Sequence, residues 1–236
     1  MIQFESRGAV GALAAFTAGY FLYWFVANSS GLRRFWEKRA SPEAAQASYI
    51  LSQRGVGILF LGAPAVLVIL LLPELRFRDF GLKAIDSPVP LYWMLGISVA
   101  VVPLVLAFSR SPRFFRTYPL IRRKSWDLRL IAANTVSWGL YILIYEFLFR
   151  GLLLGACRRP FGVWPAVLVN VALYMCVHLP YGFLVTLGSL PLGIAMCLAT
   201  VHTGSIWTAY VVHLLVALLN DYVALAANPR ARVRLG

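Results

Sequence analysis

Residues 128–157 read LRLIAANTVSWGLYILIYEFLFRGLLLGAC, an apolar run that contains three charged side chains, Arg129, Glu146 and Arg150. A helix needs about 20 apolar residues to cross the core of a bilayer. This run is longer, so we expect a helix that is tilted in the membrane, or broken near Gly151, where a re-entrant segment is the alternative to a single span. The run therefore predicts a membrane protein with opposite charges inside the membrane.

Apolar runs of this kind recur along the whole chain. Of the 236 residues, 60% are hydrophobic and 13% are charged, and the mean hydropathy is +0.74, whereas soluble domains are nearer half apolar and a quarter charged. The further spans that we expect are at 9–27, 55–73, 91–108, 164–179, 183–201 and 205–226. The sequence thus predicts an all-α fold, a polytopic transmembrane helix bundle of about seven spans within a range of six to eight.

The basic residues lie mainly between the predicted spans. The formal net charge is +13, from 22 basic and 9 acidic residues. The two loops richest in Lys and Arg, 28–54 and 110–127, should be cytoplasmic and should contact anionic lipids. No nucleic-acid-binding motif is visible, so we expect no nucleic acid partner. Arginine outnumbers lysine, which is associated with high-GC bacteria, and we expect an integral protein of the bacterial cytoplasmic (inner) membrane.

Glu146 and Arg150 form the first candidate site. They are four residues apart, so they share one face of a helix and can form an ion pair. Ionisable groups inside a span are costly and often functional. The pair is either purely structural, or it makes Glu146 a general base that Arg150 holds ionised and oriented. Tyr145 lies on a neighbouring stripe and could donate a hydrogen bond.

His178 ends a polar stripe on the fifth predicted span. Asn170, Tyr174 and His178 recur at every fourth position of an otherwise apolar helix. Such a stripe either makes hydrogen bonds between helices or lines a cavity. Three polar groups in register favour a cavity.

His213 is the histidine of the last predicted span, and like His178 it lies on an otherwise apolar helix. Asn220 and Asp221 follow it by seven and eight residues, which is two helical turns along the same side. Helix packing is the structural alternative for His213, and the edge of the membrane is the alternative for Asp221.

Three short motifs resemble those of one family of membrane proteins. The run Tyr145-Glu146-Phe-Leu-Phe-Arg150-Gly151 resembles the first motif of the CAAX protease and bacteriocin-processing (CPBP, or Abi) family. Tyr174-Met-Cys-Val-His178 resembles the second motif, and Gly204-Ser-Ile-Trp207 followed by His213 resembles the third. The motifs occur in the family order and lie on three separate spans.

This resemblance divides the chain into three parts. Residues 1–127 are expected to form N-terminal membrane helices and basic loops, residues 128–228 a CPBP-like catalytic helix bundle, and residues 229–236 a basic tail. Two positions depart from the family pattern. The first motif usually has two adjacent glutamates, and the first of them is Tyr145 here. The Asn or Asp that usually follows the third-motif His by four residues is Ala217, so Asn220 or Asp221 is the expected substitute.

The resemblance implies hydrolysis of a peptide bond within the membrane, in a leader or C-terminal segment of a membrane-embedded or lipid-anchored protein or peptide. Glu146 would then activate water, His178 would orient it, and His213 with Asn220 would stabilise the oxyanion. Arg150, Tyr145, Tyr174 and Asp221 would support these residues. Hydrolysis also requires a cavity that brings water to the site.

Other interpretations remain open at this level. No cofactor is expected, but Glu146, His178 and His213 could instead ligate Zn²⁺ with one open position. A catalytically inactive relative, acting as a membrane scaffold or immunity factor, is the main alternative to a protease. A small transporter is the weakest alternative, because no inverted repeat is visible.

Overall fold

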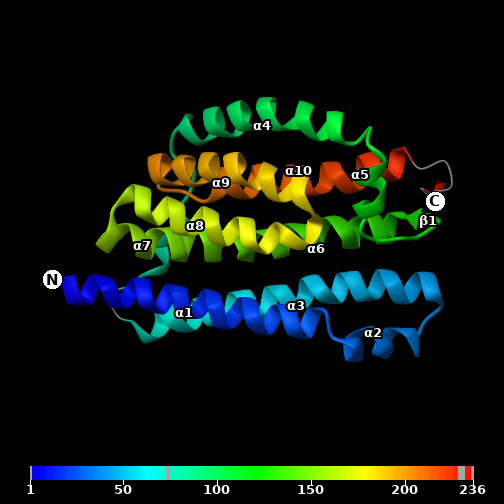
Figure 1. The fold of residues 1–236 in the computed structure, drawn as a ribbon, viewed down its shortest axis with the longest axis horizontal. Coiled ribbons are helices and arrows are strands. Elements are labelled where there is room, and N and C mark those ends of the chain that lie inside the picture. Colours follow the sequence, from blue (N-terminus) through cyan, green and yellow to red (C-terminus); the bar gives the residue numbers. More distant parts are fainter. Residues whose placement is uncertain (1, 73–74, 228–231, 235–236) are drawn as a thin grey trace.

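The computed structural model describes residues 2–72, 75–227 and 232–234. Within these residues the chain folds into a bundle of long helices, with short helices and one strand pair in the connections (Figure 1). The long helices are α1 (Ile2–Ala27), α3 (Pro42–Leu71), α4 (Val89–Phe108), α6 (Leu128–Glu146), α8 (Val163–His178), α9 (Phe183–Thr203) and α10 (Trp207–Ala226). The shorter elements are α2 (Ser30–Glu37), η1 (Phe77–Phe80), α5 (Pro112–Thr117), β1 (Ser125–Asp127), η2 (Phe147–Leu153), α7 (Leu154–Phe161), η3 (Leu179–Tyr181) and β2 (Arg232–Arg234).

The predicted all-α, polytopic bundle is confirmed. The described part of the chain contains seven helices long and apolar enough to cross a membrane, counting α6, η2 and α7 as one continuous span, Leu128–Phe161. Large apolar side chains such as Leu70, Val99 and Leu104 are exposed on the outside of the bundle, where lipid would cover them. The predicted basic tail, 229–236, lies outside the described residues except for the backbone of β2, which pairs in parallel with β1.

Helix starts follow from local sequence signals. Asp127 caps α6, because its carboxylate accepts a hydrogen bond from the backbone N–H of Leu130 at 2.8 Å. The second span, α3, begins at Pro42, with proline in the first helical turn, and not at residue 55 as the hydropathy predicts. The amphipathic helix of this region is α2, which Ser29 caps.

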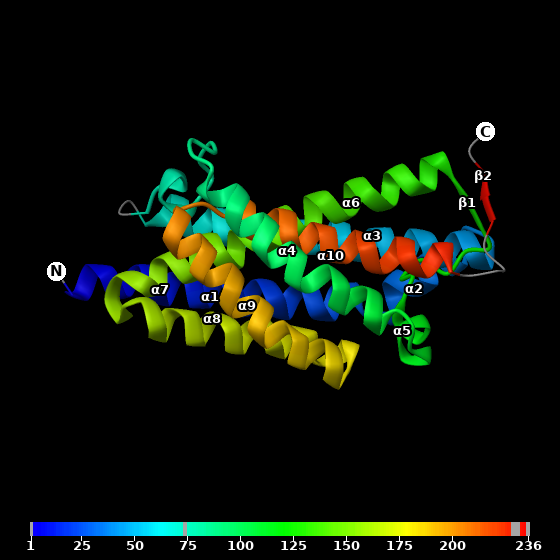
Figure 2. The same cartoon turned by 90° about the horizontal axis from the view of Figure 1, so that it is seen from above.

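The helices lie in layers in Figure 1: α1 and α3 at one side, then α6–α7 and α8, then α9 and α10, and α4 at the other side. Seen from above in Figure 2, α6 and α10 both extend toward the end of the bundle that carries β1 and the C-terminus. The α8–α9 hairpin is shorter and stays nearer to the opposite end. As a result, residues from α6, η2, α8, α9 and α10 can meet inside the bundle.

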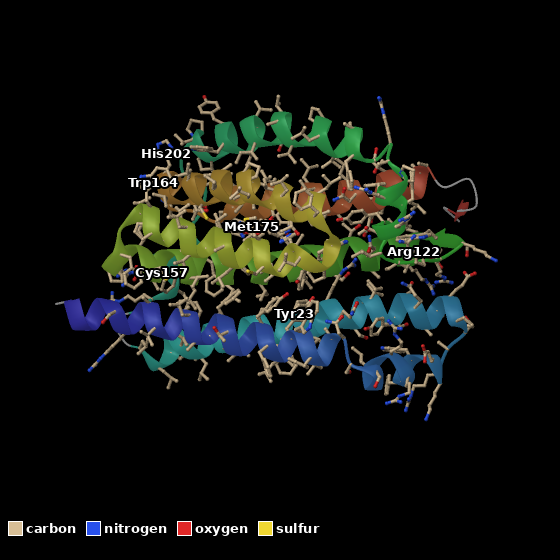
Figure 3. All side chains as sticks on the ribbon, viewed as in Figure 1. Tyr23, Arg122, Cys157, Trp164, Met175 and His202 are labelled. Carbon is tan, nitrogen blue, oxygen red and sulfur yellow. The ribbon has the colours of Figure 1, made fainter. Side chains whose placement is uncertain are left out.

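The two basic loops lie at the same end of the bundle, as their common cytoplasmic assignment requires. Gln46 of α3 donates to the backbone oxygen of Leu120 at 2.9 Å and accepts from the backbone N–H of Arg122 at 2.8 Å. Figure 3 shows Arg122 at this end, away from Cys157 and Trp164 at the other. The charge distribution is therefore consistent with one basic, cytoplasmic end.

A buried polar cluster joins α3, α6 and α10 in the half of the bundle nearer the basic end. Arg54 Nη1 donates to Asn134 Oδ1 and Ser137 Oγ, both at 2.8 Å, and Arg54 Nη2 lies 3.6 Å from Asp221 Oδ2. Trp138 Nε1 donates to the same carboxylate oxygen at 2.8 Å. Arg54 and Asp221 are only 4% and 0% exposed, so each charge depends on the other for compensation.

Replacing Arg54 by Met should lower the free energy of unfolding by about 3–5 kcal/mol, because Asp221 would be left as a buried, uncompensated charge. Unfolding in mixed micelles, followed by circular dichroism, would measure this. Lys38→Met is the matched control and should change the stability by no more than about 0.5 kcal/mol, since Lys38 is exposed. Equal effects of the two changes would contradict a stabilising role for the cluster.

Candidate active site

Glu146 is the last residue of α6, and its side chain has no exposed surface. Arg150 of η2 donates from Nη1 to Glu146 Oε1 at 3.4 Å, and the same nitrogen lies 3.2 Å from Oε2. The guanidinium also lies over the ring of Tyr174, 4.2 Å from its centroid. The predicted pair on one helix face is therefore present, and Arg150 compensates the carboxylate charge where water cannot.

His213 of α10 completes the surroundings of this carboxylate. Its Nδ1 lies 2.5 Å from Glu146 Oε1, and its side chain is 14% exposed. The contact joins the first and third predicted motifs, which are 67 residues apart in the chain. Because Nδ1 is occupied by Glu146, Nε2 is the ring nitrogen left to contact a further group.

His178, the last residue of α8, lies beside this pair without touching the carboxylate. Its ring centroid is 6.4 Å from that of His213, and its Nδ1 contacts the backbone oxygen of Tyr174 at 2.7 Å. Tyr174 itself lies against both imidazoles, at centroid distances of 4.4 and 6.0 Å. The structure thus brings Glu146, His178 and His213 from three helices into one site, as expected.

The helix does not re-enter at Gly151. It continues from α6 to α7 through the π-helical segment η2, so the predicted break is a local widening of the helix. Asn170 of α8 donates to the backbone oxygen of Phe149 at 2.6 Å, within η2. Gly151 allows the backbone of η1 to approach, since a Cβ there would lie 2.8 Å from the oxygen of Phe80. A π segment is frequent at functional sites because it displaces side chains from the regular helical register.

Tyr145 occupies the position of the first family glutamate. Its side chain is 4% exposed, and its hydroxyl has no hydrogen-bond partner among the described residues. The ring stacks on Phe149 at 4.4 Å and meets the ring of His213 edge-on at 5.4 Å. The ring of Tyr145 therefore packs against His213, and its buried hydroxyl has no hydrogen-bond partner among the described residues.

Asn220 and Asp221 are not brought to Glu146. Asp221 is fully buried in the cluster with Arg54 and Trp138, and it also accepts a hydrogen bond from the backbone N–H of Leu120 at 3.0 Å. Asn220 is buried two turns from His213, roughly 10 Å along the helix axis. Asp221 is thus fully buried between helices, and its bond to Leu120 of the second basic loop places it toward the basic end of the bundle. Sequence reasoning placed Arg54 in a polar loop and missed its burial, although it directly precedes an apolar run.

The donor set gives little support to a zinc site. Among the described residues, no group of three or more His, Cys, Asp and Glu side chains is arranged to hold a metal ion. Glu146 Oε1 already contacts both His213 Nδ1 and Arg150, and His178 Nδ1 is occupied by a backbone oxygen. These three side chains do not converge on a common point, so we derive no step through a metal.

Residues 130–219 match the model of the family described as type II CAAX prenyl endopeptidase Rce1-like. No curated protein and no solved structure matches the chain. The matched region contains Glu146, Arg150, His178 and His213, and it stops short of Asn220 and Asp221. The match confirms the predicted resemblance to the CPBP family and supports, in general terms, an integral membrane protein of the CAAX-type intramembrane protease kind.

Replacing Asn170 by Leu should destabilise the protein by about 1–3 kcal/mol, because it leaves the backbone oxygen of Phe149 buried without its donor. Unfolding in mixed micelles, followed by circular dichroism, would measure this loss of stability. Asn28→Leu is the matched control: Asn28 also donates from Nδ2 to a backbone oxygen, at 2.9 Å, but at an exposed position. The role assigned to Asn170 would be wrong if the two substitutions had the same small effect.

Proposed function

We propose that the protein is an intramembrane endopeptidase of the glutamic CPBP type, which processes a leader or C-terminal segment of a membrane-associated protein. The observation that carries this proposal is the contact of Glu146 Oε1 with His213 Nδ1 at 2.5 Å beside the compensating Arg150. A buried carboxylate held by an imidazole and a guanidinium is suited to take up and return a proton. The resemblance to CAAX prenyl endopeptidases supports the reaction class.

In the first step Glu146 removes a proton from a water molecule, and the water oxygen forms a bond to the carbonyl carbon of the scissile peptide. The carbonyl π electrons move to its oxygen, which becomes an oxyanion. In this mechanism His178 orients the water, and His213 donates to the oxyanion from Nε2 when it is protonated there. In the second step the proton passes from Glu146 to the amide nitrogen, the oxyanion electrons re-form the carbonyl as the C–N bond breaks, and a carboxylic acid and an amine are released; the acid then gives its proton to the amine or to water.

Tyr145 is the further donor that we assign to the oxyanion. The family pattern supplies an Asn or Asp at the position of Ala217, and the alanine has no polar group to offer. The Tyr145 hydroxyl is buried and unpaired and its ring contacts that of His213, whereas Asn220 lies two turns away from His213, and we therefore prefer Tyr145 as the donor. The Tyr145 phenol would thus occupy the position of the absent glutamate. It would also stabilise the oxyanion in place of the Asn or Asp that is absent at position 217.

The position of the site bears on the substrate. His213 lies six residues into α10, roughly 9 Å along the axis from Trp207 at the end opposite the basic loops. If the basic loops are cytoplasmic, this half of the bundle faces the outer leaflet. An exported protein with a membrane anchor is therefore the substrate class that fits best.

Glu146→Gln should lower peptide cleavage about 100- to 10,000-fold, because the amide cannot accept a proton from water. The measurement uses the purified protein in proteoliposomes with single-span leader peptides and a prenylated C-terminal peptide as probes, and mass spectrometry of the products. Glu43→Gln is the control and should cleave like the unaltered protein, since Glu43 lies in the first turn of α3 at the basic end. Unaltered cleavage by Glu146→Gln would exclude Glu146 as the base. Cleavage that resists chelators supports the metal-free mechanism.

Tyr145→Phe should lower the cleavage rate about 100- to 1000-fold, as expected for the loss of one oxyanion donor, and should leave the KM nearly unchanged. Tyr141→Phe is the matched control, one turn earlier on α6, because its hydroxyl donates to Tyr23 at 3.4 Å. If both variants retain full activity, the oxyanion donor is another group.

A catalytically inactive relative remains the second candidate, and one observation favours it. Both oxygens of Glu146 contact Arg150 or His213, and the carboxylate has no exposed surface, so a water molecule must displace one of these contacts. An inactive protein would cleave none of the probes, and Tyr145→Glu, which restores the family's paired glutamates, would then be the variant to gain activity.

A further inference from the structure

A cleft enters the bundle from the end opposite the basic loops and reaches the far side of the candidate active site. It is formed by η1, by η2 with α7, and by the end of α9, and it has a cavity volume of about 40 Å³ that is partly open to the surroundings. The residues that matter for its chemistry are Asp79, Arg150, Gly151, Arg158, Thr200 and Gly204. Glu146, His178 and His213 do not line it.

Two side chains in the wall of the cleft have polar atoms without partners. Arg150 uses Nη1 for Glu146, but its Nε and Nη2 have no hydrogen-bond partner among the described residues. The hydroxyl of Thr200 has none either. These side chains are 1% and 8% exposed, and buried donors without acceptors are rare in folded proteins. The wall of the cleft therefore contains several donors that require an acceptor.

Positive charge is also in excess around the cleft. Arg158 lines the cleft, is exposed and forms no ion pair within the described part of the chain. The Lys83 ammonium lies at the rim, 3.5 Å from the position that a Cβ on Gly204 would take. The one acidic residue in the wall, Asp79, is engaged by Arg159 at 3.3 Å. Because helical side chains lean toward the N-terminus of their helix, Arg158 leans from the mouth toward the level of Arg150.

The mouth of the cleft has a defined structure. The backbone N–H of Ile206 donates to the oxygen of Gly81 at 3.2 Å, and Trp207 Nε1 donates to the backbone oxygen of Lys83 at 2.7 Å. These bonds join the segment after η1 to the connection between α9 and α10. Gly204 ends α9 with φ +64°, a conformation that glycine adopts without strain. Lys83 is therefore carried on a segment that is held against the connection between α9 and α10.

We propose that this cleft binds an oxyanion of the phosphate class, either the phosphate of a lipid headgroup or free phosphate. Water could accept hydrogen bonds from Arg150 and Thr200, but it would leave Arg158 and Lys83 uncompensated. A phosphate group satisfies both needs, since its oxygens accept from several donors and its charge offsets the excess of cations. The cleft opens where the spans end, at the level of headgroups. This site is separate from the proposed peptidase reaction and does not depend on it.

The test measures binding of two probes to the purified full-length protein. Isothermal titration with inorganic phosphate in detergent tests the free ion, and native mass spectrometry after extraction from phosphatidylglycerol vesicles tests the headgroup. We expect saturable binding in at least one arm, weakened at least tenfold by Arg158→Gln and by Thr200→Val. Binding in the first arm identifies free phosphate, and retained lipid without phosphate binding identifies the headgroup.

Two matched variants separate a built site from general attraction. Arg113→Gln removes an exposed, unpaired cation at the opposite end, and Thr200→Ser keeps the hydroxyl; both should bind like the unaltered protein. The thermal midpoint of each variant reports its folding, and the exposed Arg158 can be replaced without disturbing the core. The proposal is overturned if neither probe binds, or if Arg113→Gln weakens binding as much as Arg158→Gln.

Discussion

The buried carboxylate of Glu146 is the constraint around which this bundle is organised. A charge at this depth has no water to stabilise it, so the protein must supply every partner. Arg150 comes from the next turn of the same continuous helix, His213 comes from α10, and Tyr174 supports the guanidinium from α8. Arg150 and His213 contact Glu146 directly and Tyr174 contacts the guanidinium, which requires α8 and α10 to pack against the α6–η2 segment at defined heights.

Two contacts, at different positions along the helix axes, fix the axial register of α10 relative to α6. Glu146 meets His213 at one level, and Trp138 donates to Asp221 at the other. The two residues on α6 are eight apart, and so are the two on α10, which is what antiparallel helices of equal rise require. Arg54 joins α3 to the second level. Asp221, expected near the catalytic groups, therefore serves to hold them in register from a distance.

The π-helical segment between α6 and α7 gives the site its local geometry. It lies directly after Glu146 and contains Arg150, whose guanidinium thereby contacts both Glu146 and the ring of Tyr174. Asn170 donates to a backbone oxygen within this segment. The same segment forms a wall of the cleft described above, so that Arg150 lies between the candidate catalytic groups and the candidate anion site. The departures from the family pattern, Tyr145 and Ala217, fall at positions next to this arrangement and change its donors without removing the carboxylate.

The sequence by itself determined the seven spans, the pairing of Glu146 with Arg150 and the polar stripe that ends at His178. These features follow from hydropathy and from helical spacing, which act over a few residues along one helix. Only the tertiary structure decided that His213 contacts Glu146 through Nδ1, that Asp221 joins Arg54 in a separate cluster, and that the long fourth span widens into a π segment instead of re-entering. Such features depend on which residues of other helices lie opposite, and that is set by the packing of the whole bundle.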